Sequence, residues 1–311
     1  GGYSGAMLTY LGRRLVMSLV VLFGLSLLVF TMVNLSGDPV RLLLPPDATN
    51  AQVDELRRTL GLDAPLVERY WRFLGQFVRF DFGDSLQFRQ DALGLVLERL
   101  PATLSLAGLA ILLAVVVGVP LGVLAALRRD GASDAVITGV AVTGQSLPVF
   151  WVAVMGILLF AVQLKWLPAA GAASWRHYVL PTGTLALFLL GGIVRMTRIS
   201  MLEVLGAAYV RTASAKGLRR GRVVWRHALR NAAIPVVTVI GLQLRFVLGG
   251  SVITETVFAW PGLGRLLVRS VYARDYPVVE AGVLVVAVFL ILVNTLVDIT
   301  FTLLNPRVRL Q

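Results

Sequence analysis

Residues 101–127 read PATLSLAGLAILLAVVVGVPLGVLAAL, a stretch of 27 residues without a charged side chain. Because an α-helix rises 1.5 Å per residue, this stretch is long enough to cross the roughly 30 Å hydrocarbon core of a lipid bilayer. It therefore predicts a membrane-spanning helix, and the chain on either side of it repeats the pattern.

Four other runs of about 17 to 30 residues carry no charge, and one more run is interrupted only by Arg245. These runs cover residues 15–35, 135–164, 178–194, 281–297 and, around Arg245, 232–254. With 101–127 they predict six spans. The composition agrees, since 57% of the residues are hydrophobic and 15% are charged, whereas soluble domains carry about a quarter charged residues. We therefore expect an all-α polytopic membrane protein with six transmembrane helices.

Two of these runs have features of their own. The run 135–164 is too long for one untilted span, and Gln145-Ser146-Leu147-Pro148 inside it predicts a kink or a helix break. The first run leads into the polar Ser36-Gly37-Asp38-Pro39 without a small-residue cleavage site, so we expect a retained helix rather than a signal peptide. Met7 is expected to be the natural start.

The basic residues predict the orientation of the six spans. Of the 29 lysines and arginines, 15 lie on the side of the two termini, 5 lie in the two short opposite loops, and 8 share a long segment with 10 acids. The positive-inside rule then places both termini in the cytoplasm. The predicted segments are 1–14 (cytoplasmic), 15–35 (first span), 36–100 (extracytoplasmic, helical), 101–199 (spans two to four), 200–231 (cytoplasmic), 232–305 (spans five and six with a short outer loop) and 306–311 (cytoplasmic).

The composition and the charge exclude several classes of function. The net charge of +12 is explained by topology, so nucleic-acid binding is not expected. The chain has no cysteine and two histidines, His177 and His227, which fall in loops on opposite sides. Disulfides, thiolate nucleophiles and Cys/His metal sites are thereby excluded. We expect no catalytic residue and no metal site, and an intramembrane enzyme is disfavoured.

The segment 36–100 is too organised for a simple linker. Asn50 as an N-cap and Gly61 as a stop predict a helix over Ala51–Leu60, and Pro65 opens a second, aromatic helix. The apolar surface around Trp71 and Phe77 needs a cover. It either lies in the headgroup region or forms a cap over the outer mouth that contacts a binding protein, and the cap is the interpretation we favour.

The segment 200–231 is basic and rich in small residues, which allow another surface to approach the backbone closely. On charge alone it is equally explained as a loop that enforces topology. Its sequence is more specific than that. Tyr209-Val-Arg-Thr-Ala-Ser-Ala-Lys-Gly-Leu218, followed by Arg226-His-Ala-Leu-Arg-Asn-Ala-Ala-Ile-Pro235, resembles the cytoplasmic loop of permease subunits from the dipeptide/oligopeptide/nickel branch of ABC importers.

Further motifs of that family occur in order from Leu11 to Leu310, among them Asp81-Phe-Gly-Asp-Ser85, Leu147-Pro-Val-Phe-Trp151, Glu255-Thr-Val-Phe-Ala-Trp-Pro-Gly-Leu-Gly264 and Asp275-Tyr-Pro277. The resemblance implies the type I importer permease fold and a prokaryotic plasma membrane. It implies three kinds of protein partner besides lipid: a homologous second permease, two cytoplasmic ATPases and an extracytoplasmic solute-binding protein. Peptides, nickel chelates, glutathione, sugars and haem are all substrates of similar scaffolds.

The resemblance assigns ATPase coupling to this loop. The residues concerned are Arg211, Thr212, Ala213, Ala215, Lys216, Gly217 and Leu218, and we expect Thr212–Leu218 to form a short helix. The family's usual acid and one of its two alanines are missing, since Arg211-Thr212-Ala213 stands in their place. The only two lysines, Lys165 and Lys216, are not followed by Ser or Thr, so this chain lacks a P-loop. We expect no cofactor here, with ATP and Mg²⁺ on the partner ATPases.

A secondary transporter or a channel is the main rival class. Such proteins carry intramembrane ionisable groups for coupling. Polar residues within the predicted spans are costly to expose to lipid, and four of them are our candidates for the translocation path: Gln145, Arg245, Asn294 and Asp298. The alternative for each is a hydrogen bond to a neighbouring helix without any contact to a substrate.

Overall fold

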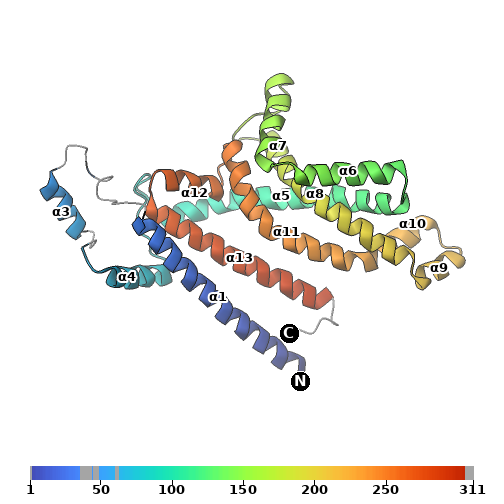
Figure 1. The fold of residues 1–311 in the computed structure, drawn as a ribbon, viewed down its shortest axis with the longest axis horizontal. Helices are drawn as coiled ribbons and strands as arrows, with labels where there is room; N and C mark the ends of the chain where they lie inside the picture. Colours follow the sequence, from blue (N-terminus) through green and yellow to red (C-terminus); the bar gives the residue numbers. More distant parts are fainter. Residues whose placement is uncertain (1, 36–43, 45–48, 60–62, 305–311) are drawn as a thin grey trace. The chain divides into compact units, whose positions relative to one another are not determined.

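The computed structural model describes residues 2–35, 44, 49–59 and 63–304. Within these residues the backbone is predominantly helical (Figure 1). The chain divides into two compact units, one built from residues 1–100 and 266–292 and the other from residues 101–265 and 293–309. Each unit is described by itself below.

The helices account for the predicted spans. In the described part of the chain four helices are long and apolar enough to cross a membrane, and two bent pairs raise the number to six if each pair is one span. The four are α1 (Gly2–Leu35), α5 (Ala92–Leu127), α8 (Arg176–Leu205) and α13 (Tyr276–Leu304). The first bent pair joins α6 (Ala132–Ser146) to α7 (Val149–Gly156), which continues as the π-helical segment η1 (Ile157–Gln163). The second bent pair consists of residues 220–244 and 249–257, which meet at 58°, so its bend lies within α11 (Leu229–Val257).

The predicted break in the run 135–164 is confirmed at the expected residues. α6 ends at Ser146, α7 begins at Val149, and the two halves of the pair meet at 102°. Leu147 has an extended backbone, with ψ of 137°, because a residue before proline is pushed out of the helical region. Pro148 has no N–H with which to continue α6.

α8 is the central helix of the larger unit. It lies beside α6 and α11, and Figure 1 shows the three next to one another. Small residues allow close packing: a Cβ on Gly122 of α5 would lie 2.6 Å from Cβ of Thr197 on α8. The core joins α5, α8 and α11 through Leu106, Ala110, Leu189, Ile193 and Val247. α8 therefore links three helices of this unit to the segment that follows its end.

That following segment contains three short helices. α9 covers Ala208–Ala215, α10 covers Arg220–Arg222, and the π-helical segment η2 covers Val223–Ala228 before α11 begins. The helix expected over Thr212–Leu218 was therefore misplaced. α9 begins four residues earlier, and Gly217, with φ of +76°, lies beyond its end, in the left-handed conformation that favours glycine.

In the smaller unit, two helices follow α1. α3 covers Asn50–Thr59, and Asn50 is not its N-cap as predicted. Thr49 caps it instead, because the Gln52 N–H donates to Oγ1 of Thr49 at 3.4 Å and the Thr49 N–H donates to Oε1 of Gln52 at 2.9 Å. This is a capping box, with the glutamine three residues after the cap. The predicted stop at Gly61 lies outside the described residues.

α4 (Leu66–Arg79) begins directly after Pro65, as the sequence predicts, and packs on α1. The ring of Tyr70 lies 5.3 Å from that of Phe30, and its hydroxyl lies 3.0 Å from Oγ of Ser26. The aromatic face of α4 is therefore covered in part by the first membrane-spanning helix. The smaller unit also contains most of α12 (Leu263–Tyr272) and the start of α13.

Two motifs that are far apart in the sequence meet at the start of α13. The fully buried carboxylate of Asp275 accepts hydrogen bonds from the Ser85 hydroxyl at 2.5 Å and from the backbone N–H groups of Leu86 at 3.0 Å and Gln87 at 3.3 Å. A buried carboxylate needs such donors to offset its lost hydration. The contact fixes residues 85–87 to the start of α13.

Candidate functional site

Residues 200–231, which we call the coupling segment after the role predicted from the sequence, are folded against the end of α5. The segment's apolar residues Met201, Val224 and Ala228 are buried in a cluster with Val123 and Ala126 near the end of α5. Val210 of α9 is buried as well. The segment is therefore a folded part of the larger unit, and a displacement of it would be passed to α5 and α8 through packed side chains.

Two polar contacts hold α9 in place. The Asn231 amide donates to the hydroxyl of Tyr209 at 2.8 Å and to the carbonyl of His227 at 3.2 Å. The Arg211 guanidinium donates to the carbonyl of Gly206 at 3.1 Å. Tyr209 and Asn231 belong to the two motifs quoted for this segment, and their contact joins the two motifs in the fold. The sequence alone did not single out either residue.

The residues proposed for coupling occupy both α9 and the turn after it. Ala213 is half-buried, whereas Ala215, Lys216 and Gly217 are exposed. A Cβ added at Gly217 would meet no atom within 4 Å. The described side chains around this surface include several exposed cations: Arg211, Arg219, Arg220, Arg222, Arg226 and Arg230. The arrangement offers a small-residue surface framed by positive charge.

The path candidates lie on different helices. Gln145 is half-buried at the contact of α6 with α8, where a Cβ added to Gly191 would lie 2.7 Å from Cβ of Gln145. Asn294 and Asp298 are half-buried on α13, and Oδ1 of Asn294 is buried without a hydrogen-bond partner. The side chain of Arg245 lies outside the described residues. The contacts of Gln145 support its helix-packing role, and a lining role for these four residues stays a prediction.

The two aromatic residues of the outer segment differ in exposure. Trp71 is 62% exposed, whereas Phe77 is half-buried, with its ring 5.9 Å from that of Phe73 and 6.2 Å from that of Phe82. Phe77 therefore stabilises the fold of the smaller unit. A contact of Trp71 with a cap or a binding protein stays a prediction.

Glu255 organises the opposite end of the larger unit. Its carboxyl group is 0% exposed and accepts hydrogen bonds from the Thr103 hydroxyl at 2.7 Å and from the Arg265 N–H at 3.0 Å. Oγ1 of Thr103 accepts the Leu263 N–H at 2.8 Å. The first turn of α12 is thus satisfied by side chains of α5 and α11, and the carboxyl group lies at the positive end of the helix dipole.

The glycines and the tryptophan of the same motif have related roles. A Cβ on Gly262 would overlap the Glu255 carboxyl group, and one on Gly264 would lie 2.8 Å from the Val252 backbone. Trp260 is fully buried, donates from Nε1 to the carbonyl of Ala102 at 3.0 Å, and packs edge to face on Tyr178. The stretch 255–264 therefore joins α5, α8, α11 and α12. The family motif includes Glu255, but the sequence alone does not predict the contacts of its carboxyl group.

The sequence matches a known family along most of its length. Residues 118–310 match the family described as the binding-protein-dependent transport system inner membrane component, and residues 7–107 match the N-terminal region of such membrane components. The chain belongs to this family.

Close relatives agree along nearly the whole length. The chain is 43% identical over 304 residues to the glutathione transport system permease protein GsiC of Escherichia coli (strain K12), which covers 97% of this chain and 99% of that protein. GsiC of Shigella dysenteriae serotype 1 is similar to the same degree. The family and these relatives identify the chain as a multi-pass inner-membrane permease subunit of an ATP-driven importer, and they do not favour a secondary transporter or a channel.

Solved structures support the fold. The inward-facing MetNI methionine ABC transporter has a chain that matches with a TM-score of 0.57 at 22% identity, covering 68% of this chain and 96% of that one. A chain of an amino acid ABC transporter matches with a TM-score of 0.51 at 15% identity, covering 67% and 93%. The all-helical importer permease fold is thereby confirmed. Subunits of this family are permeases and not themselves enzymes.

We predict that Glu255→Ala destabilises the permease by at least about 2 kcal/mol, because it leaves several buried donors without an acceptor at about 1–3 kcal/mol each. Thermal unfolding of the detergent-solubilised protein measures the loss. Glu203→Ala is the matched control, since Glu203 is exposed near the end of α8 and its substitution is expected to change the midpoint little. Equal midpoints for the two variants would contradict the role of Glu255.

Proposed function

We propose that this permease imports short peptides, glutathione among them, and that ATPase subunits dock on its coupling segment to drive alternating access. The partners would be a second, homologous permease, two cytoplasmic ATPases that bind ATP and Mg²⁺, and an extracytoplasmic solute-binding protein. In this scheme, closure of the ATPases biases the pore between inward-open and outward-open states. The observation that carries the docking proposal is the exposure of Ala215 and Gly217 at the end of α9, in a segment that also carries several exposed arginines.

The proposed orientation has both termini and residues 200–231 in the cytoplasm and residues 36–100 outside. It is supported by the distribution of arginines and by the six-span count. Sulfhydryl labelling of single cysteines tests it, because the chain has none of its own. Ser85 is unsuitable, since it is buried and bonded to Asp275, so the exposed Gln90 serves for the outer segment and the exposed Lys216 for the coupling segment.

We expect a membrane-impermeant maleimide, added to intact cells that produce the permease without its ATPases, to label Gln90→Cys and not Lys216→Cys. After permeabilisation both should react. Labelling of both positions from outside intact cells would exclude the proposed orientation.

The peptide class of substrate is supported by the family motifs and by the identity to GsiC, whose name states a glutathione transport system. We predict that the solute-binding protein that works with this permease binds glutathione and other short peptides. Calorimetric titration of the purified binding protein with glutathione, di- and tripeptides, a nickel chelate, a sugar and haem measures the preference. Binding of the chelate, the sugar or haem at least tenfold more tightly than of any peptide would contradict the peptide assignment.

We predict that Gly217→Trp and Ala213→Trp reduce ATP-dependent uptake and co-purification of the ATPases at least tenfold. Overpacking a close interface costs about 1–3 kcal/mol, and 1.4 kcal/mol is a factor of ten in affinity. Charge reversal at Arg219 and Arg220 should have a smaller effect, because charges at an interface rim are screened and mainly change the association rate.

Gly217→Ala is the matched control for the tryptophan. It places an L-residue at the same positive φ without the bulk, so a loss specific to Gly217→Trp arises from the interface rather than from backbone strain. If the tryptophan variants retain normal amounts of ATPase and normal uptake, the motor docks elsewhere.

A further inference from the structure

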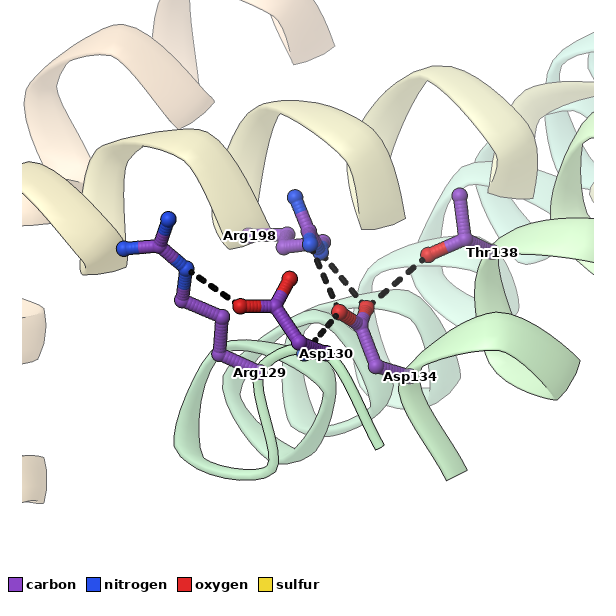
Figure 2. A network of polar contacts seen from close by, with 5 residues as sticks. All are labelled: Arg129, Asp130, Asp134, Thr138 and Arg198. Carbon is purple, nitrogen blue, oxygen red and sulfur yellow. Dashed lines mark hydrogen bonds and ion pairs between the residues drawn. The ribbon is translucent and has the colours of Figure 1, made fainter. Parts of the chain in front are cut away.

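A largely buried ion pair joins α6 to α8 close to the start of the coupling segment. The guanidinium of Arg198, on α8, donates from Nε to Oδ1 and from one terminal nitrogen to Oδ2 of Asp134, both at 2.6 Å (Figure 2). The side chains of Asp134 and Arg198 are 7% and 24% exposed. A two-pronged contact of this kind fixes orientation as well as distance, because the planar guanidinium matches the carboxylate edge to edge.

The pair is complete within the larger unit. Oδ1 of Asp134 also accepts the Thr138 hydroxyl at 3.3 Å, and Oδ2 accepts the backbone N–H of Asp130 at 3.1 Å. The Asp130 carboxylate pairs with Arg129, whose side chain is 66% exposed. The carboxylate of Asp134 thus has two donors at each oxygen, which leaves little capacity for a transported solute. Its position, rather than solute binding, therefore suggests its task.

Around Arg198, two turns of α8 contact three other elements, namely α5, α6 and η2. Thr197 lies against Gly122 of α5, Arg198 holds α6, and Met201 is buried with Val224 and Ala228 of η2. The coupling segment begins two residues after Arg198. A force applied to α9 and η2 would therefore reach α8 first, through packed side chains, and would reach α6 through the ion pair.

The ion pair lies at the first turn of α6, and a second set of contacts with α8 lies near the other end of α6. Its N-cap, Gly131, has no capping side chain, and its other end is the break at Leu147-Pro148. Near that break α6 lies closely on α8, where a Cβ on Gly144 would come 2.8 Å from Leu187 and one on Gly191 would come 2.7 Å from Gln145. α6 is thus attached to α8 at both ends, by the ion pair at the coupling end and by close packing at the other.

We propose that Asp134 and Arg198 are positioning residues of coupled transport, which make α6 move together with α8 when the coupling segment is displaced. The proposal rests on the proposed function, since it needs a motor that acts on residues 200–231. Without the pair, α6 would keep its close packing on α8 near Ala141, Gly144 and Gln145 and would lose its polar attachment at the coupling end. Movement of α8 would then reach the α6–α7 pair incompletely, so ATP would be hydrolysed with little transport.

The test uses the assembled importer in proteoliposomes, with its binding protein, a peptide substrate and ATP. For Asp134→Asn and Arg198→Gln we expect normal co-purification of the ATPases, uptake at least tenfold lower, and at least tenfold more ATP hydrolysed per substrate molecule. Arg198→Lys keeps the charge and loses the two-pronged geometry, so it should give an intermediate ratio. A role in folding alone would reduce the amount of complex and leave the ratio of ATP to substrate unchanged.

Arg129→Gln is the matched control. It removes a cation from the connection between α5 and α6, and Arg129 pairs with Asp130 rather than with Asp134. Its uptake and its ratio should stay within twofold of the unsubstituted importer. Unchanged ratios in Asp134→Asn and Arg198→Gln would overturn the proposal. Absence of ATP-dependent uptake in the unsubstituted importer would instead count against the proposed function.

A measurement on the intact pair keeps the proposal falsifiable if the variants fail to assemble. Spin labels at Val136 on α6 and Ile199 on α8, both exposed, report the separation of the two helices by pulsed electron resonance. With Asp134 and Arg198 present, we expect the same distance in the nucleotide-free and the ATP-bound importer. A distance that changes between the two states would show that α6 does not move with α8 and would overturn the proposal.

Discussion

The structure depends on one constraint of its solvent, namely that lipid offers no partner to a backbone N–H or C=O group. A continuous spanning helix satisfies its own backbone groups. Where a helix ends or a new one begins, the free N–H and C=O groups need hydrogen-bond partners from elsewhere. Where α11 ends and the chain turns back into α12, these partners are Glu255 and Thr103, which accept the N–H groups of the new helix. The same need explains the glycines of this motif, since a side chain at Gly262 would occupy the place of the carboxyl group.

α8 is the element through which the two ends of the larger unit are connected. Tyr178, near its start, packs on Trp260, while Met201, near its end, packs under the coupling segment. Between them Gly191 and Ile193 lie against α6 and α5. A rigid helix with close contacts at both ends transmits a displacement better than a flexible connection, because packed interfaces change between discrete arrangements rather than deforming continuously.

Much of this architecture could be predicted from the sequence, and the failures have physical causes. The uncharged runs and Pro148 predicted the spans and the break, because both are properties of local composition. The predicted start of α9 was wrong by four residues. Its small residues carry no strong periodicity, and its start is set by the burial of Val210 and by the contact of Tyr209 with a distant residue. α12 was missed because its first turn depends on Glu255 of another helix.

Asp134 and Arg198 show most clearly what sequence reasoning cannot see. Asp134 lies directly before the uncharged run 135–164, and Arg198 is one of the 15 basic residues on the predicted cytoplasmic side. The positive-inside rule counts such charges without asking what they contact. In the structure Arg198 is paired and largely buried, whereas the arginines of the coupling segment are exposed. The basic residues counted on the predicted cytoplasmic side thus include one that holds two helices together and several that are exposed. A buried charge needs hydrogen bonds or an opposite charge to offset its lost hydration, and Arg198 obtains both from Asp134, whereas an exposed arginine keeps its contact with water.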